Sequence, residues 1–255
     1  MKEFYNLFCH DFRRRLKDSF LIGYNIIFPI IMIGLIGYLS SENYGNTFTG
    51  YHYYSIVMLP FCIAMVVITA AFAAKEEAYK KTAVRFLFAP ISMTHIVLSK
   101  LLSITIVVCI CNLLVLAFAW VVFGLPIVAH IFPLIIILAS ETFAVSAIGL
   151  FIGFGMRNFI IIKNLLNIPI IIAAILGGVF FPIGTFNHGW QLIIKLSPLT
   201  WINRGEFLCI YDNNNILLWK TAMIITAVGI IFTILAVILF KKEGFIHGNL
   251  PGYDK

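Results

Sequence analysis

The sequence contains little charge for its length. Only 11% of its 255 residues are Asp, Glu, Lys or Arg, whereas 61% are hydrophobic, and the mean hydropathy is +1.00. Soluble domains carry about 25% charged residues, so this composition excludes a soluble globular protein and indicates that lipid is the main solvent. Because a helix needs roughly 20 apolar residues to cross the hydrocarbon core, we expect one membrane domain with several spans.

The sequence also lacks the motifs of common catalytic sites. It has no phosphate-binding G-x-x-x-x-G-K-[ST], no H-E-x-x-H and no G-x-S-x-G, which serve nucleotide, zinc and nucleophile chemistry. Neither the six His nor the five Cys residues have metal-site spacing, and we interpret the cysteines as small apolar residues. We predict that the chain is not an enzyme, binds no cofactor or metal itself, and receives any energy it uses from outside.

The net charge of +7 does not indicate a nucleic-acid partner. The basic residues lie between hydrophobic segments and form no continuous soluble patch, so membrane lipid is the anionic partner that we expect. The first 17 residues mix basic, acidic and aromatic side chains, and the apolar run after them is too long for the core of a signal peptide. We expect the N-terminus to remain on the mature protein.

Residues 1–19 predict an amphipathic helix that lies in the membrane interface. Phe4, Phe8, Phe12 and Leu16 recur every four residues with charged residues between them, which is typical of such a helix. The segment 20–240 then predicts an all-α membrane domain of six transmembrane helices. Their expected ranges are 20–39, 54–74, 101–123, 131–156, 165–181 and 220–240.

The basic residues predict the orientation of these helices. With the N-terminus inside, 15 of the 18 Lys and Arg residues fall in segments on the cytoplasmic side and three on the outer side. An excess of Lys and Arg marks cytoplasmic segments. We therefore expect a multi-pass protein of the cell membrane with both termini, including the tail 241–255, in the cytoplasm.

Two connections are too long to be simple turns. The cytoplasmic one, 75–90, opens with KEEAYKKTAVRF, and its helix-forming residues predict a short surface helix that ends before Pro90. The external one, 182–215, contains apolar residues in runs too interrupted for a span. We expect it to form short helices that re-enter the outer leaflet.

Glu141 lies inside the fourth predicted span. An ionisable group at this depth is costly, and by default it indicates a functional contact with a proton, a substrate or a partner helix. The alternative is a structural carboxyl group, protonated or not, that hydrogen-bonds a neighbouring helix through Ser140 or Thr142, or a partner subunit. The sequence leaves both interpretations open.

Small and aromatic residues mark two further features. Gly149 and Gly153 form a G-x-x-x-G pattern in the fourth span, which lets another helix approach closely, either within the chain or from a second copy. Phe180 and Phe181 stand at the outer end of the fifth span. Together with Glu141, these rings are candidates for a substrate path or a hydrophobic gate.

The cytoplasmic connection, EEAYKKTAVRFLFAPISMTHIVLSK, resembles the signature of the type-2 ABC-exporter permease family, the transmembrane subunits of drug, peptide and polysaccharide exporters. In that signature an acid precedes a Thr, two apolar residues, a Pro-x-Ser turn and a Lys. The residues that match are Glu77, Thr82, Phe86, Leu87, Pro90, Ser92 and Lys100. Two positions differ, because Lys81 replaces the usual Gly and Glu76 replaces the usual basic residue.

A second match lies in the external connection. The segments LGGVFFPIGTF and LSPLTWINRGEF, with Trp190 between them, resemble the family's Phe-Pro run and its Leu-x-Pro-Leu motif. The resemblance covers essentially the whole chain. It implies the same six spans, interfacial N-terminal helix and re-entrant external segment.

The resemblance also implies partners and a mechanism. Two permeases, identical or similar, would pair with two cytoplasmic ABC ATPase subunits that bind ATP and Mg. Closure of the ATPases would push on a coupling helix and switch the permeases between inward- and outward-facing packing. The residues implied in ATPase coupling are Glu76, Glu77, Lys80, Lys81, Thr82, Arg85 and Pro90.

Three functions remain open from the sequence. The first is export of an amphipathic substrate such as a drug, an antimicrobial peptide or a lipid-like molecule, because Phe, Ile and Met line the expected path. The second is export of a lipid-linked polysaccharide, which the same family also performs. The third is a membrane scaffold or sensor that does not transport.

Overall fold

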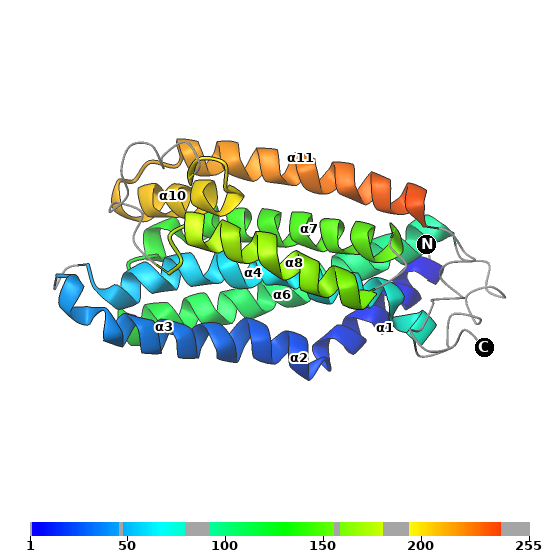
Figure 1. Ribbon diagram of the computed structural model, residues 1–255, viewed down its shortest axis with the longest axis horizontal. Coiled ribbons are helices and arrows are strands. Elements are labelled where there is room, and N and C mark those ends of the chain that lie inside the picture. Colours follow the sequence, from blue (N-terminus) through cyan, green and yellow to red (C-terminus); the bar gives the residue numbers. More distant parts are fainter. Residues whose placement is uncertain (1, 46–47, 80–91, 156–158, 181–193, 241–255) are drawn as a thin grey trace.

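The protein folds into an elongated bundle of helices (Figure 1). The computed structural model describes residues 2–45, 48–79, 92–155, 159–180 and 194–240, and within these ranges no residue lies in a β-strand. The all-α prediction is therefore confirmed for this part of the chain. The helices in chain order are α1 (Lys2–Leu16), α2 (Ser19–Ile22), a π-helical turn (Gly23–Ile27), α3 (Phe28–Leu39), a 3-10 turn (Ser41–Asn43), α4 (Gly50–Tyr79), α6 (Met93–Phe123), a second 3-10 turn (Val128–His130), α7 (Ile131–Gly155), α8 (Phe159–Leu176), α10 (Pro198–Tyr211) and α11 (Ile216–Leu239).

Five helical segments in the described ranges are long and apolar enough to cross a membrane, so this is a multi-pass membrane protein. They are Ser19–Leu39, Gly50–Glu76, Met93–Phe123, Val128–Gly155 and Ile216–Leu239. Each matches one predicted span. The sixth predicted span, 165–181, falls on α8, whose apolar part Asn164–Leu176 is shorter than the others. The number of six spans stays a prediction.

Several helices extend beyond the apolar runs that predicted them. α6 begins eight residues before the predicted start at 101, because Ser92 caps it and its Oγ accepts from the His95 N–H at 3.3 Å. α4 continues without a break to Tyr79. Residues 75–79 are therefore the last turns of α4 and not the start of a separate surface helix, while 80–91 lie outside the described residues.

The centre of the bundle is the close contact between α4 and α7. A Cβ added to Gly149 would lie 2.5 Å from the main-chain oxygen of Val67, and one added to Gly153 would lie 2.5 Å from that of Ala71. Only glycine permits this approach of two helices. The G-x-x-x-G pattern thus packs within the chain, and Gly229 of α11 meets α7 from another side with similar closeness.

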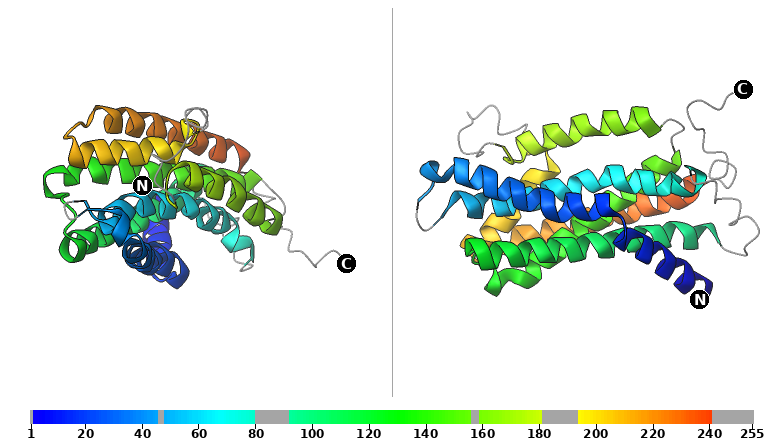
Figure 2. Two further views of the ribbon diagram at one scale, coloured as in Figure 1. Left: turned by 60° about the vertical axis from the view of Figure 1, so that its left-hand side comes forward. Right: turned by 90° about the horizontal axis from the view of Figure 1, so that it is seen from below.

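The first helix packs against the bundle through a face that the sequence did not predict. Leu7, Asp11 and Arg15, at intervals of four, are buried. The predicted Phe stripe lies on the flank, where successive rings of Phe4, Phe8 and Phe12 stack with centroids 6.4 and 5.8 Å apart. A helix is present at Lys2–Leu16. Its position in the membrane interface stays a prediction, and Figure 2 shows α1 inclined to α3.

We call the two ends of the bundle the α1 end and the α10 end, after the helices that lie there. The α1 end contains the end of α4 and the start of α6, and the α10 end contains the start of α4 and the end of α8 (Figure 1). α10 is the short helix predicted within the external connection. Its partners are α11, α4, α8 and α7, whereas 181–193 lie outside the described residues.

Candidate functional site

A buried ion-pair network lies at the α1 end, where α4 leads into the segment 80–91. Glu76 of α4 accepts from both arginines of α1: its Oε1 lies 2.6 Å from Arg14 Nη2, and its Oε2 pairs with Arg15 Nη2. Glu76 and Arg15 are only 6% and 5% exposed. A buried charge is tolerated only when it is paired and hydrogen-bonded, and each of these side chains supplies that partner to the other.

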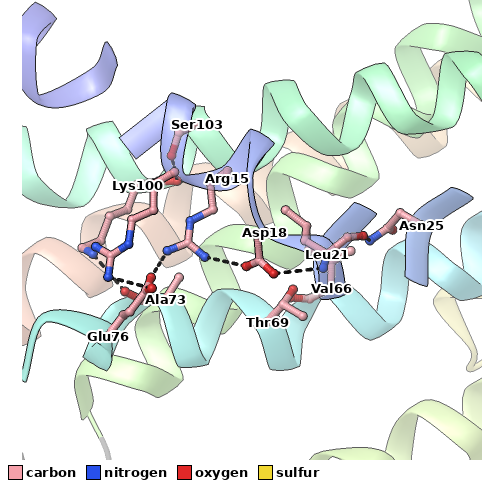
Figure 3. A network of polar contacts seen from close by, with 11 residues as sticks. Arg15, Asp18, Leu21, Asn25, Val66, Thr69, Ala73, Glu76, Lys100 and Ser103 are labelled. Atoms are coloured by element: carbon pink, nitrogen blue, oxygen red, sulfur yellow. Dashed lines mark hydrogen bonds and ion pairs between the residues drawn. The ribbon is translucent and has the colours of Figure 1, made fainter. Parts of the chain in front are cut away.

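Arg15 extends the network along the chain towards the first span. Its Nη1 donates to Asp18 Oδ2 at 3.2 Å, and Asp18 Oδ1 accepts from the Leu21 N–H at 3.2 Å. Asp18 is therefore both the N-cap of α2 and a counter-charge for Arg15. Figure 3 shows Glu76, Arg15 and Asp18 in a row from α4 to α2. The start of the first span is thus held by the same charges that hold the end of α4.

The start of α6 joins the network through Lys100. This lysine is 4% exposed, and its Nζ donates to the Ala73 main-chain oxygen of α4 at 2.9 Å. A cation near the C-terminal turns of a helix interacts favourably with its dipole. Ser99 adds a contact to α1, because its Oγ donates to Asp11 Oδ2 at 2.6 Å.

These contacts hold α1, α4 and α6 together where the chain enters and leaves the segment 80–91. α4 enters this segment and α6 leaves it, and both are tied to α1 within their last and first turns. A movement of α4 or α6 at this end of the bundle therefore also involves α1. Within the described residues, no three His, Cys, Asp or Glu side chains gather as a metal site.

Only part of the predicted coupling set falls on described residues. Glu76 is in the network. Glu77 lies in the last turns of α4, but its side chain is not among those described. The rest of the set, Lys80, Lys81, Thr82, Arg85 and Pro90, lies outside the described residues, so these roles stay predictions. Arg14, Arg15 and Asp11 were missed as site residues, although the spacing of Leu7, Asp11 and Arg15 marks one helix face.

The candidate substrate-path residues lie away from this network. Phe180 meets Phe61 of α4, with ring centroids 5.9 Å apart at an interplanar angle of 67°, while Phe181 lies outside the described residues. Glu141 is 3% exposed. Glu206 of α10, a residue that was not singled out from the sequence as a site residue, is equally buried.

α10 closes the end of α8 through side-chain hydrogen bonds. The last carbonyls of a helix have no partner within it. Here three side chains on one face of α10 and its N-cap supply donors to main-chain oxygens at the end of α8. Ser197 donates to the Ala173 oxygen at 3.0 Å and Thr200 to the Leu176 oxygen at 3.0 Å. Asn203 donates to the Gly177 oxygen at 2.7 Å. Tyr53 of α4 donates to the oxygen of Gly178 at 2.7 Å. The two helices α8 and α10 therefore form one joined pair.

We expect Asn203→Ala to loosen this joint. The substitution leaves the buried oxygen of Gly177 without its donor, and an unsatisfied buried polar group costs about 1–3 kcal/mol. Hydrogen exchange at the end of α8 should therefore accelerate in the variant, measured by mass spectrometry. Asn164→Ala, at an exposed position of α8, is the matched control, and equal exchange in the two variants would contradict a capping role.

Comparison with known proteins agrees with this architecture. The model of the ABC-2 type transporter family matches residues 2–211, from the first residue of α1 to the last residue of α10. Among curated proteins no significant match was found. The family match covers the ion-pair network, the α4–α7 contact and the α8–α10 joint, and it includes well over half of the sequence. The chain belongs to the ABC-2 type transporter family.

Proposed function

We propose that the chain is the permease subunit of an ATP-driven exporter, with the α1 end in the cytoplasm. The charge distribution supports this orientation, because Arg13, Arg14, Arg15 and Lys100 lie at the α1 end and basic residues favour the cytoplasmic side. Separate ABC ATPase subunits would bind ATP and Mg. α8 would be the sixth span, and a second permease, identical or similar, would complete the transporter.

The ion-pair network is the observation that carries this proposal. An ATPase that pushes on the segment 75–90 needs a firm connection from that segment to the spans. Glu76 ties α4 to α1, and Lys100 ties α6 to α4. α4 then contacts α7 through Gly149 and Gly153. A push that reaches Glu76 would be passed to the centre of the bundle through these contacts.

We further propose an amphipathic substrate such as a drug, an antimicrobial peptide or a lipid-like molecule. Phe180, the candidate ring for its path that lies within the described residues, contacts a second apolar ring, Phe61 of α4. Aromatic side chains contact apolar and amphipathic molecules over a large area. ATP hydrolysis by the reconstituted complex, stimulated by such compounds, would support this class. Stimulation by lipid-linked glycan alone would favour polysaccharide export instead.

Glu77→Lys tests the coupling role. If Glu77 contacts the ATPase, reversal of its charge should uncouple substrate from ATP hydrolysis or release the ATPase from the complex. The measurement is substrate-stimulated hydrolysis in proteoliposomes, together with a subunit count after copurification. Glu42→Gln, at an exposed position in the turn after α3, is a control at the opposite end of the bundle from Glu77. Unchanged stimulation in Glu77→Lys would remove this residue from the coupling role, and copurification without any ATPase would indicate a scaffold or sensor.

A further inference from the structure

Asn112 carries a buried amide group in the membrane-spanning part of α6. It lies about 16 Å along the helix axis from the last residue, Phe123, which is the depth of the hydrocarbon core. The residue is 3% exposed, and neither its Oδ1 nor its Nδ2 has a hydrogen-bond partner among the described residues. At this depth an amide without partners is costly. Asn112 therefore offers an unused donor and an unused acceptor.

A small cavity lies beside this amide, between the neighbouring helices α6 and α7. Asn112, Cys109 and Leu113 line it on α6, and apolar residues that include Ile135 and Ala139 line it on α7. Its volume is about 10 Å³, which is about the room that one water molecule or one hydroxyl group needs. The cavity can therefore bring one small polar group to the amide.

The cavity lies at the outer face of the bundle. Leu113 in its wall is 39% exposed, and Ile135 and Ala139 are half-buried. Ile106 and Ile110 are exposed to the same degree as Leu113, and their spacing of four and three residues places all three on one stripe of α6. A molecule dissolved in the bilayer can therefore approach the cavity from the side, with an apolar surface next to it.

The chemistry of the lining selects a hydroxyl group. A hydroxyl group both donates and accepts hydrogen bonds, so it can donate to Oδ1 of Asn112 and accept from Nδ2 at the same time. A carbonyl or ether oxygen has no donor and would leave Oδ1 unpaired. An ionised group would be buried without a counter-charge, which is costly, because no charged side chain is among the described residues of the lining.

We propose that the cavity beside Asn112 is a binding site for the hydroxyl group of an aliphatic alcohol dissolved in the bilayer. The hydroxyl group enters the cavity and binds the amide, while the alkyl chain stays in the lipid along Ile106, Ile110 and Leu113. Binding needs neither ATP nor a partner subunit. The site is therefore independent of the exporter assignment, and it can be tested on the purified chain alone.

Photolabelling of the chain in lipid nanodiscs tests the site. The probe is octanol with a photoreactive diazirine in its alkyl chain, and mass spectrometry locates the labelled residues. We expect labels within residues 106–116 of α6 and 135–139 of α7. Excess octanol should suppress this labelling, whereas octane, which has the same chain without a hydroxyl group, should not. Suppression by octane as well would overturn the site, and so would the absence of labels, which would indicate that the cavity takes only water.

Two variants separate the amide from the room beside it. Asn112→Leu removes the donor and the acceptor at similar volume, a change that is nearly neutral or stabilising where the polar group was unpaired, and labelling should fall about tenfold. Ala139→Leu keeps the amide but fills the cavity, and it gives the same test if Asn112→Leu does not fold. Asn25→Leu, at another buried asparagine of the spans, is the matched control. Labelling that persists in both cavity variants, or that falls equally in the control, would overturn the proposal.

Discussion

Replacement of both Gly149 and Gly153 by isoleucine should strongly destabilise the bundle. At each position even the first added carbon would lie 2.5 Å from a main-chain oxygen of α4, and a backbone cannot give way as a flexible side chain can. Overpacking of a close contact costs about 1–3 kcal/mol per site and occasionally more. We therefore expect the double variant to lose about 2–6 kcal/mol, seen as a lower thermal midpoint in detergent and as aggregation on size-exclusion chromatography.

Gly34→Ile is the control for this experiment. Gly34 lies in an apolar span like the other two, but an added Cβ there would meet nothing within 4 Å. The control should behave as the native chain does, which separates the effect of close packing from that of a bulkier residue in a membrane helix. A stable and monodisperse double variant would show that α4 and α7 can part without loss of the fold.

The second large effect is expected from Glu76→Gln. The substitution removes the counter-charge of Arg14 and of Arg15, and Arg15 is buried. Arg15 would then keep only Asp18 as a counter-charge, and a buried charge that loses its partner altogether costs about 3–5 kcal/mol, which is the upper bound for this variant. α1 should detach from the bundle. Trypsin should then cleave at residues 13–15 in the variant while the native chain remains intact at that place.

Glu76→Gln also tests whether the ion-pair network couples substrate to ATP hydrolysis, which is measured separately from stability. In the reconstituted complex, Glu76→Gln should retain ATP hydrolysis by the partner but lose its stimulation by substrate, because the push on the segment 75–90 no longer reaches α1. Glu42→Gln is chemically identical and exposed, so it should change stability by less than about 0.5 kcal/mol. If Glu76→Gln matched this control in both cleavage and stimulation, the network would have no coupling role.

The positions of the spans followed from the sequence because each needs a long apolar run in lipid. The helix ends did not follow in the same way. Lys100 was taken as the boundary of the third span, but its ammonium group donates to the Ala73 carbonyl inside the protein, and α6 begins at Met93, where Ser92 caps it. Hydropathy predicts which residues face lipid, whereas a helix ends where its hydrogen bonds and caps end.

The ion-pair network was less predictable than the spans, because the residues that pair in it are distant in sequence. Glu76 was singled out through the family resemblance, yet nothing local indicates that its partners are Arg14 and Arg15, since Arg15 is 61 positions away. Glu206 was missed for a similar reason. It lies in a segment expected outside the spans, and only the fold of α10 buries it. Pairing of charges across helices is a property of the packed bundle.

The distance along the chain between Arg15 and Glu76 sets an order of events during synthesis. A ribosome adds about 5–20 residues per second, so the 61 residues from Leu16 to Glu76 take about 3–12 s to make. During this interval α1 exists without the acid that neutralises its arginines, and the polar side of the bilayer is the place where these charges cost least. α1 can dock only after the second span has been made and inserted. Its docking is complete only once the third span has been made as well, because Asp11 of α1 accepts from Ser99 of α6.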